Sequence, residues 1–419
     1  MSGNNQVPKL RFLGFNGEWE EKYLKDCLEE RNEQYPENEE YPLMAFIADK
    51  GVSPKGERYD RSALVKDASN KKYKRTEFGD FIYSSNNLEA GSIGLNSYGK
   101  ACISPVYSIF KSKDGVDPSF MGALLTQKTF ISEMVKYRQG VVYGQWKIPE
   151  KDFLGIKVSV PTFTEQKKIS SCLSDIDKLI AAQDEKVAAL KEQKRGLLQQ
   201  FFPEEGETLP RLRFPEFDGE WTEHSLGDIG NTYSGLSGKT KEDFEKGDFK
   251  FITFMNVLNH VRVDTSILGV VSVKDGERQN RVEYGDMLFN TSSETPEEVG
   301  FCAVLDSIMD NNVYLNSFCF GYRFKDMNKY QPVFLAYYFR SDYGRDLMRK
   351  LAQGITRYNL SKEYFNKAVV KFPSFEEQEK IVNCLTELDK IIDSESSIVG
   401  ILKEYKKGLI QQLFPKTNK

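Results

Sequence analysis

The sequence predicts an α+β fold: two mixed globular domains joined by two long helices that form an antiparallel coiled coil with pseudo-twofold symmetry. Three observations support this prediction. Residues 162–203 and 374–415 are copies of each other, a shorter motif is repeated ahead of each globular segment, and both globular segments mix short apolar strands with amphipathic helices. A repeat of this length indicates a duplicated structural unit, so the two halves are expected to share one framework.

Each repeated stretch has the signals of one long helix, and the copies align without a gap at a constant offset of 212 positions. Both open with a capping-box pattern and close at a proline: Thr162-x-x-Glu165 and Pro203 in the first, Ser374-x-x-Glu377 and Pro415 in the second. Proline cannot donate to the hydrogen-bond ladder of a helix, so it marks the expected end.

Apolar residues follow a heptad pattern within each copy, which favours helix-on-helix packing. In the first copy the pattern puts Ile169, Ile176, Gln183, Leu190 and Leu197 at a, Cys172, Leu179, Lys186, Gln193 and Gln200 at d, and Leu173, Ile180, Val187 and Phe201 at e. In the second it puts Ile381, Leu388, Glu395, Leu402 and Leu409 at a, Cys384, Ile391, Ile398, Tyr405 and Gln412 at d, and Leu385, Ile392, Val399 and Leu413 at e. A lone helix of roughly 40 residues, about 60 Å long, cannot bury such a stripe. We therefore expect the copies to pair antiparallel and to cross near Gln183 and Glu395.

Gly196 and Gly408 interrupt good helix-forming sequence at equivalent positions, where each costs about 1 kcal/mol relative to alanine. One explanation is that another backbone approaches closely at these positions. The other is that the glycines are a tolerated kink, and the sequence leaves both explanations open.

A second repeat, here called the lead-in segment, precedes each globular segment at residues 8–19 and 210–221. Leu10-Arg11-Phe12 and Gly17-Glu18-Trp19 are matched by Leu212-Arg213-Phe214 and Gly219-Glu220-Trp221. Each half thus has the same order of lead-in segment, globular segment and long helix. The expected domains are 1–161 (first globular domain), 162–203 (first helix), 204–373 (linker and second globular domain) and 374–415 (second helix).

The globular segments differ in sequence but keep traces of a common plan. Gly79-Asp80 and Gly285-Asp286 each predict a turn, followed by a short apolar strand and a loop rich in hydroxyl and amide side chains. Residues 119–137 and 332–352 have the pattern of amphipathic helices, and 154–161 and 367–373 predict a last strand before each long helix. A constant framework around two unlike inserts suggests that the framework sets geometry while the inserts carry a variable task. The alternative is a duplicated domain that has drifted.

Composition and motifs argue against several function classes. The 419 residues carry a net charge of −4 and have neither a signal peptide nor a long apolar run, which predicts a cytoplasmic protein without a membrane span. Six cysteines without a C-x-x-C motif, and only two histidines, predict no metal site. Phosphate-loop, dinucleotide-binding and methyltransferase motifs are absent, so no catalytic residue is predicted. Glu165-Gln166-Lys167 matches a fragment of nuclease sites, but its place at a helix start favours capping.

Matched polar, basic and aromatic clusters in the two globular segments are the candidate DNA contacts. Arg, Asn and Gln read base edges, whereas Lys, Ser and Thr suit phosphates. The candidates of the first segment are Lys71, Lys72, Tyr73, Lys74, Arg75, Ser85, Asn86, Asn87, Tyr143, Gln145 and Lys147. Those of the second are Arg278, Asn280, Arg281, Asn290, Thr291, Ser292, Thr356, Arg357, Tyr358 and Asn359. A solvated loop explains any one cluster better, but matched placement in both halves favours a shared role. Neither segment is basic overall, so charge alone gives no support.

On these residues the chain resembles the specificity subunit of type I restriction-modification systems. The resemblance covers the whole chain and rests on the two repeated helices, the two lead-in segments, Pro161 with Glu165-Gln166, and Pro373 with Glu377-Gln378. It implies that the globular segments are target recognition domains, each reading one half of a bipartite target in double-stranded DNA. It implies also that the helix pair is a ruler between the half-sites and docks two methyltransferase (M) subunits. S-adenosylmethionine, ATP and Mg²⁺ would then serve the M subunits and the restriction/motor (R) subunits, and this chain would bind no cofactor.

Two other functions stay open from the sequence. One is an enzyme, a methyltransferase or nuclease with an unrecognised site, which the missing motifs disfavour. The other is a coiled-coil scaffold that binds proteins without sequence-specific DNA readout.

Overall fold

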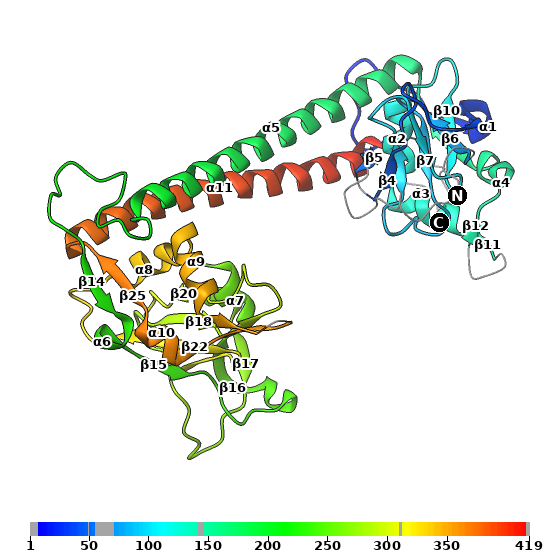
Figure 1. The fold of residues 1–419 in the computed structure, drawn as a ribbon. Coiled ribbons are helices and arrows are strands. Elements are labelled where there is room, and N and C mark those ends of the chain that lie inside the picture. Colours follow the sequence, from blue (N-terminus) through cyan, green and yellow to red (C-terminus); the bar gives the residue numbers. More distant parts are fainter. Residues whose placement is uncertain are drawn as a thin grey trace. The chain divides into compact units, whose positions relative to one another are not determined.

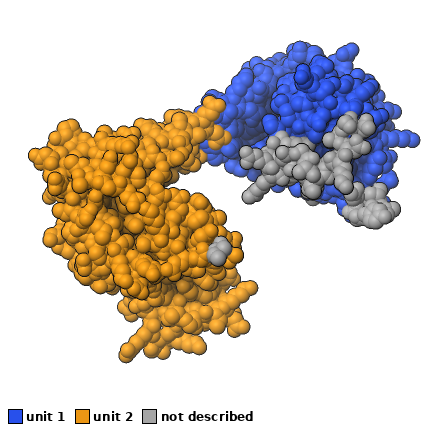
Figure 2. Space-filling view, in the orientation of Figure 1, with its two compact units in different colours: residues 1–183, 398–419 blue, residues 184–397 orange. Residues whose placement is uncertain are grey.

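The computed structural model describes residues 7–48, 50–54, 71–140, 146–309, 312–354 and 356–415. The chain divides into two compact units, shown in different colours in Figure 2: unit 1 holds residues 1–183 and 398–419, and unit 2 holds residues 184–397. Each unit therefore contains one globular segment and a part of both long helices, α5 (Phe163–Phe201) and α11 (Phe375–Leu413), which are labelled in Figure 1.

Unit 1 is built around a four-stranded antiparallel sheet in the order β2-β10-β7-β8. Its strands are β1 (Glu20–Tyr23), β2 (Leu28–Glu30), β3 (Gln34–Tyr35), β4 (Ala45–Ile47), β5 (Gly51–Ser53), β6 (Tyr73–Thr76), β7 (Phe81–Tyr83), β8 (Ile93–Leu95), β9 (Ala101–Ile103), β10 (Ser108–Ser112), β11 (Gln139–Gly140), β12 (Trp146–Lys147) and β13 (Lys157–Val160). Its short helices are α1 (Leu24–Cys27), α2 (Pro118–Leu125), α3 (Lys128–Val135) and α4 (Glu150–Leu154).

Unit 2 has a corresponding four-stranded antiparallel sheet in the order β15-β22-β18-β20. Its strands are β14 (Thr222–Ser225), β15 (Gly230–Ser234), β16 (Phe244–Ile252), β17 (Gly269–Val271), β18 (Met287–Asn290), β19 (Ser292–Ser293), β20 (Cys302–Val304), β21 (Val313–Leu315), β22 (Cys319–Phe324), β23 (Ala352–Gln353), β24 (Tyr358–Leu360) and β25 (Val369–Phe372). Its helices besides the long pair are α6 (Leu226–Ile229), α7 (Phe254–Asn259), α8 (Pro332–Tyr338), α9 (Asp342–Leu351) and α10 (Lys362–Lys367).

The predicted turn and strand are present in both units, at β7 and at β18. Gly79 and Gly285 enter the turn at φ of 84° and 83°, a backbone conformation that glycine adopts without strain. The buried Asp80 and Asp286 follow, and each carboxylate accepts a backbone N–H from three residues earlier, at 2.7 and 2.8 Å. The central strand of each sheet therefore begins after the same turn, a glycine at positive φ followed by a buried aspartate.

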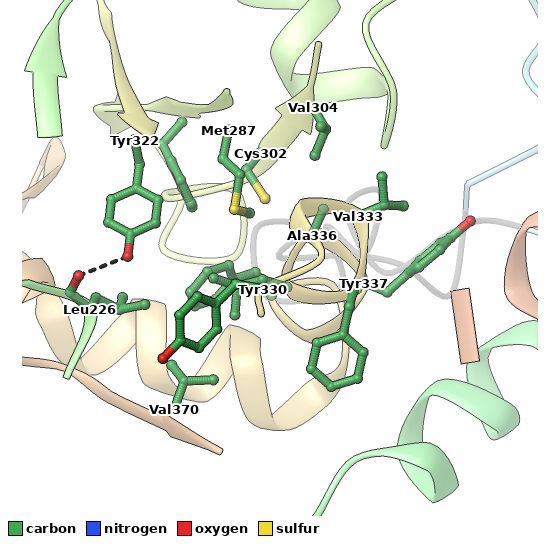
Figure 3. Close-up of a cluster of buried hydrophobic side chains, with 14 of the residues drawn as sticks. Leu226, Met287, Cys302, Val304, Tyr322, Tyr330, Val333, Ala336, Tyr337 and Val370 are labelled. Carbon is green, nitrogen blue, oxygen red and sulfur yellow. Dashed lines mark hydrogen bonds between the residues drawn. The ribbon is translucent and has the colours of Figure 1, made fainter. Parts of the chain in front are cut away.

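The core of unit 2 lies between the four-stranded sheet and helices α8 and α10, and aromatic rings fill much of it. Phe365 of α10 packs edge-on against Phe289 of β18, with ring centroids 4.9 Å apart. The equivalent Phe153 of α4 packs against the sheet of unit 1. Figure 3 shows that the buried Tyr322 hydroxyl donates a hydrogen bond of 2.7 Å to the Leu226 carbonyl. The polar end of a core ring is thus satisfied inside the core.

The first and last strands of each globular segment pair with each other. In unit 1, β1 pairs antiparallel with β13, and in unit 2, β14 pairs antiparallel with β25. Both last strands were expected from the sequence. This pairing brings the lead-in segment of each unit beside the start of its long helix.

Helices α5 and α11 pair antiparallel, as the sequence predicts. In unit 2 the end of α5 and the start of α11 share one core cluster, whereas in unit 1 the start of α5 and the end of α11 do so. Asp177 binds Lys406 at 2.6 Å in unit 1, and the equivalent Asp389 binds Lys194 in unit 2. Duplication of the sequence has therefore duplicated an interhelical ion pair.

The predicted heptad register is wrong at the d positions. Leu179, Ile391 and Tyr405 were assigned to d, and all three side chains are exposed. Ile392 and Val399 were assigned to e, and both are buried. The expected a positions are buried or half-buried and the expected e positions are all buried, which keeps a heptad spacing. The apolar stripe is wide enough to allow two registers, and the packing uses the other one.

The glycines in the long helices are not places of close approach between described parts of the chain. A Cβ atom built at Gly196 or Gly408 would meet no atom within 4 Å. The explanation by a neighbouring backbone of this chain is therefore wrong, and both positions have room for a side chain.

The glutamates of the two capping boxes bind the lead-in segments instead of closing the boxes. The carboxylate of Glu377 accepts two hydrogen bonds of 2.8 Å from the Arg213 guanidinium. Glu165 accepts the equivalent pair from Arg11 at 2.8 and 2.7 Å. The Ser374 hydroxyl acts as expected, because it accepts the Glu377 backbone N–H at 3.3 Å.

The glutamine after each of these glutamates ties another helix to the same place. Gln166 accepts the backbone N–H of Asp117, which precedes α2, at 2.9 Å. Gln378 accepts the backbone N–H of Gln331, which precedes α8, also at 2.9 Å. The Glu-Gln pair thus explains why these two residues recur at both helix starts: one holds the lead-in segment and the other holds a helix of the globular segment.

The two amphipathic stretches expected as single helices are each broken into two. Residues 119–137 fall into α2 and α3, and residues 332–352 into α8 and α9. In unit 2 the break is set by Ser341, whose hydroxyl accepts the Gly344 backbone N–H and so caps a new helix. Within the described parts of the chain, every helix is too short or too polar to cross a lipid bilayer.

Candidate nucleic-acid interface

Many of the candidate residues gather at one end of the four-stranded sheet in each unit. Strands β7 and β18 run from the aspartate turn into a polar loop. Strands β10 and β22 begin beside that loop, because Ser108 pairs with Tyr83 in unit 1 and Cys319 pairs with Asn290 in unit 2. We call this side of each sheet the loop end.

In unit 1 the loop end joins the polar loop after β7 to the hairpin β11–β12. The side chain of Asn86 accepts the Trp146 backbone N–H at 2.6 Å, and the Ser85 hydroxyl accepts the Ile148 backbone N–H at 3.0 Å. Two predicted clusters, far apart in sequence, are therefore brought together. The Trp146 ring is exposed on this hairpin.

The remaining candidates of this hairpin region are Asn87, Tyr143, Gln145 and Lys147. Asn87 is exposed next to Asn86. Lys147 is exposed and lies 3.7 Å from the Glu150 carboxylate, so part of its charge is neutralised. Tyr143 and Gln145 lie outside the described residues.

The basic run of unit 1 is only partly accessible. Lys71 and Lys72 are exposed ahead of β6, and the Lys71 ammonium lies 5.7 Å from the centroid of the half-buried Tyr73 ring. Lys74 is buried, and its Nζ donates to the Tyr107 carbonyl at 3.0 Å. Burial lowers the pKa of the Lys74 ammonium. Lys74 therefore supports the turn ahead of β10 from within, and is not presented to a ligand.

Arg75 is likewise held inside unit 1. Its guanidinium lies between the rings of Tyr35 and Tyr41, 4.3 and 4.4 Å from their centroids. Such cation–π stacking on two rings fixes the side chain in place. Of the five residues in the run, the two leading lysines are the ones free to meet phosphate.

In unit 2 the loop end is a small sheet formed by β19, β24 and β23. Ser292 pairs with Asn359, and Ser293 pairs with Tyr358, which joins the polar loop to the hairpin β23–β24. The exposed candidates at this hairpin are Thr356, Arg357 and Asn359, and the candidate Tyr358 is half-buried. This is the counterpart of the joining of loop and hairpin in unit 1.

Two candidates of unit 2 are anchors of the loop end. Asn290 is fully buried and its amide donates to the Glu298 carbonyl at 2.9 Å. The Thr291 backbone N–H donates to the Phe318 carbonyl at 2.9 Å, and its carbonyl accepts the Leu360 N–H at 2.8 Å. These contacts shape the surface, and the exposed neighbours present the functional groups.

The basic run of unit 2 reaches the loop end through segment 234–241, which was not among the residues predicted from the sequence. Asn280 donates to the Ser234 carbonyl at 2.9 Å, and the Lys362 ammonium donates to the Ser234 hydroxyl at 2.7 Å. Gln279 both accepts from and donates to the Ser237 backbone, at 3.0 and 2.8 Å. The sequence pattern that could have identified this segment as a candidate is its two glycines followed by two lysines.

Charge is distributed unevenly along segment 234–241 and the run facing it. The buried Lys239 binds Glu277 at 2.6 Å, and this hydrogen bond lowers the Glu277 pKa to about 2. Arg278 and Arg281 are exposed, and Arg281 lines a cavity of about 450 Å³ beside Arg323. The Arg323 guanidinium is already committed to the buried Asp286.

The two loop ends offer different chemistry on a similar scaffold. Unit 1 presents amide, lysine and indole groups, whereas unit 2 presents guanidinium, hydroxyl and amide groups. Exposed amides and guanidinium groups can form paired hydrogen bonds with base edges, and lysines can contact phosphates. Two surfaces with unlike donors are suited to reading two unlike sequences.

Comparison with known proteins gives a consistent family assignment. The chain matches the family described as type I restriction modification DNA specificity domain over residues 16–192 and 218–401. Two relatives from Methanocaldococcus jannaschii are named as type I restriction enzyme specificity subunits. The match to MjaX is 24% identical over 52% of this chain and about half (51%) of that protein, and the match to MjaVIII is 22% identical over 73% of this chain and 75% of that protein.

Solved structures show the same fold at low sequence identity. The S subunit of a type I restriction-modification system from M. genitalium matches 98% of this chain and 100% of its own, at 16% identity and a TM-score of 0.55. A chain from a structural study of assembly and conformational transition in the type I R-M system matches 95% of this chain and 97% of its own, at 15% identity and a TM-score of 0.58.

Proposed function

Because the chain belongs to the type I restriction-modification DNA specificity family, we propose that it is the subunit that selects the DNA sequence in such a complex. Unit 1 and unit 2 each read one half of a bipartite target in double-stranded DNA. The chain itself is non-catalytic and acts in the cytoplasm. Methylation by M subunits with S-adenosylmethionine, and cleavage by R subunits with ATP and Mg²⁺, reside in the partners.

The observation that carries this proposal is the pair of unlike loop ends on a duplicated framework. The Glu-Gln contacts, the aspartate turn and the interhelical ion pair recur in both units, while the exposed side chains at the loop ends differ. A scaffold for proteins alone gives no reason for a constant framework to hold two different polar surfaces. Reading two unlike half-sites does.

We propose that the pairing of α5 with α11 sets the spacing between the half-sites. Both helices have 39 residues, and at about 1.5 Å per residue each is about 58 Å long. The same pair also offers a docking surface for the M subunits. In unit 1, Ile398, Ile401 and Tyr405 lie three and four residues apart on α11 and are exposed, so an apolar face of the helix is left for a partner.

The spacing is tested by deleting one heptad from both helices, residues 184–190 and 396–402. The deletion keeps the heptad seam in phase and shortens each helix by about 10 Å, so the gap between half-sites should shrink by about three base pairs at 3.4 Å each. The readout is the pattern of methylated adenines in DNA from cells that carry the M subunits with either chain. Replacing the same heptads with others of equal length is the control. An unchanged gap after deletion would reject the ruler.

DNA reading itself is separated from a protein-only scaffold by footprinting. The chain with its M subunits should protect one bipartite sequence on DNA, and should protect nothing sequence-specific when the M subunits are present alone. Protection that does not depend on the chain would favour the scaffold.

A further inference from the structure

In each unit the central strand, β7 or β18, pairs with a neighbouring strand, β10 or β22. The turn just before that neighbouring strand exposes one large apolar side chain in each unit. Val106 stands on the turn between β9 and β10, and Phe318 on the turn between β21 and β22. The two positions are equivalent at the repeat offset. Their side chains are 67% and 58% exposed, although the globular segments bury most large apolar residues. Single exposed apolar residues are common on protein surfaces, and Phe78 and Tyr284 form another matched exposed pair at the opposite end of each sheet. What sets Val106 and Phe318 apart is their place at the loop end.

Both turns lie at the loop end, beside the candidate DNA contacts. In unit 2 the Phe318 carbonyl accepts the Thr291 N–H at 2.9 Å, and its own N–H donates to the Asn316 side chain, also at 2.9 Å. In unit 1 the Tyr107 carbonyl, next to Val106, accepts from the buried Lys74. The turns are therefore held rigidly, so the exposure of the side chains is a fixed feature of the surface.

The surroundings of Phe318 are those of a base-reading group. The Arg357 guanidinium lies 5.8 Å from the Phe318 ring centroid. Among the described residues no carboxylate pairs with Arg357, so its donors are available. Phe318 also lines a cavity of about 600 Å³ that Lys241 and Glu245 share with Lys239, whose charge is already paired with Glu277.

We propose that Phe318 is a specificity-determining residue that contacts the C5-methyl group of a thymine in the half-site of unit 2. Val106 makes the equivalent contact in the half-site of unit 1. This inference rests on the proposed function and deepens it. The thymine methyl is the one apolar group that the major groove displays, and phenyl and aliphatic side chains are suited to it.

A methyl contact fits the two turns better than insertion between base pairs. Side chains that wedge into base steps are long or flat, such as phenylalanine, leucine, isoleucine, methionine and proline. Valine at position 106 is short and branched at Cβ, so it reaches a methyl group on a groove surface but not the stack of bases. Because one role should serve both equivalent positions, the surface contact is preferred.

The test compares the wild-type chain with Phe318→Ala, both in complex with the M subunits. Bound sequences are first selected from a pool of duplexes with randomised bases. Synthetic duplexes of the selected sequence then have each thymine of one half-site replaced in turn by deoxyuridine, which lacks only the methyl group. Tyr284→Ala is the matched control, because Tyr284 is 59% exposed but precedes β18 at the opposite end of the same sheet.

The expected result is that one thymine-to-deoxyuridine replacement weakens binding by the wild-type chain about four-fold, equivalent to about 0.8 kcal/mol, the value of one buried methylene. Phe318→Ala should lose its preference for thymine at that position, ignore the replacement, and keep the other half-site unchanged. Val106→Ala should have the same effect in the other half-site, and Tyr284→Ala in neither.

Three outcomes would overturn the inference or its premise, and they are distinguishable. If Phe318→Ala selects the same sequence with the same preference for thymine, the inference fails while the proposed function stands. If deoxyuridine has no effect but Phe318→Ala weakens all sequences and abolishes unstacking, seen with a 2-aminopurine reporter, the residue is a wedge and the methyl contact is rejected. If the wild-type complex selects no sequence, the proposed function itself fails.

Discussion

Removing the charge of Glu377 is expected to loosen the lead-in segment of unit 2. The Glu377 side chain is 1% exposed, and its carboxylate accepts two hydrogen bonds from Arg213, whose side chain is 16% exposed. Glu377→Gln keeps the shape and one acceptor oxygen. It loses the negative charge and one of the two charge-assisted hydrogen bonds.

The size of the effect follows from which partner stays buried. Glu377→Gln should cost about 2–3 kcal/mol, because a hydrogen bond to a charged group contributes about 1.5–3 kcal/mol and Arg213 still reaches solvent. Arg213→Ala should cost more, about 3–5 kcal/mol, because it leaves an unpaired charge on the more buried partner. Removing both side chains should cost less than the sum of the two single changes, because neither charge is then left alone.

Hydrogen exchange of the whole chain, followed by mass spectrometry, measures the loss of local stability in the lead-in segment of unit 2. The readout is the free energy of opening for peptides within residues 210–221. The equivalent residues 8–19 are an internal control, since Arg11 and Glu165 are untouched in both variants. The reasoning is refuted if Arg213→Ala costs less than Glu377→Gln, because removing the partner of the more buried charge should cost more. It is refuted also if the peptides from 210–221 and 8–19 lose protection equally.

Three further changes test the helices and the loop end. Gly196→Ala and Gly408→Ala should each stabilise the free chain by about 1 kcal/mol in urea denaturation, because a Cβ meets no atom within 4 Å at either position; a loss of stability would show a constraint that the free space does not reveal. Lys406→Asp should lower the melting temperature, and exchanging the charges with Asp177→Lys should restore most of it; no rescue would mean that the ion pair is not formed in solution. Arg357→Ala should abolish the preference for one base in the half-site of unit 2 in sequence selection, with a loss of about 1–3 kcal/mol against the preferred base; an equal loss on all sequences would mark Arg357 as a phosphate contact.

The framework was predictable because it is duplicated. A pattern that occurs twice at one offset separates signal from chance, so the long helices, their antiparallel pairing and the last strands were all foreseen. The heptad register was not, because a stripe that includes apolar a, d and e positions fits two seams, and only the packing decides between Leu179 outside and Ile180 inside. The partners of Glu165 and Glu377 were missed for a similar reason: a capping glutamate and a buried ion-pair glutamate have the same letter in the sequence.

The candidate interface was predictable in part. The polar clusters after β18 and at the hairpin β23–β24 were both candidates, but the sequence did not predict that they join or which members are buried. Lys74 and Asn290 became supports because the strands turned them inward. Segment 234–241 and Phe318 were missed, because a glycine-rich loop and a lone aromatic residue carry no matched motif, and only the fold places them beside Arg357.

The backbone contact between each lead-in segment and the end of a long helix has a topological consequence. In unit 2, Leu212 N–H donates to the Gln200 carbonyl at 2.9 Å, and residues 204–209 connect the two covalently. In unit 1, Leu10 N–H donates to the Gln412 carbonyl at 3.0 Å, and the same junction forms between segments that are almost the whole chain apart. Non-covalent contacts alone thus suffice to seal this junction. Cutting the backbone within residues 204–209 is therefore expected to leave the junction of unit 2 held by the same kind of contact that holds it in unit 1.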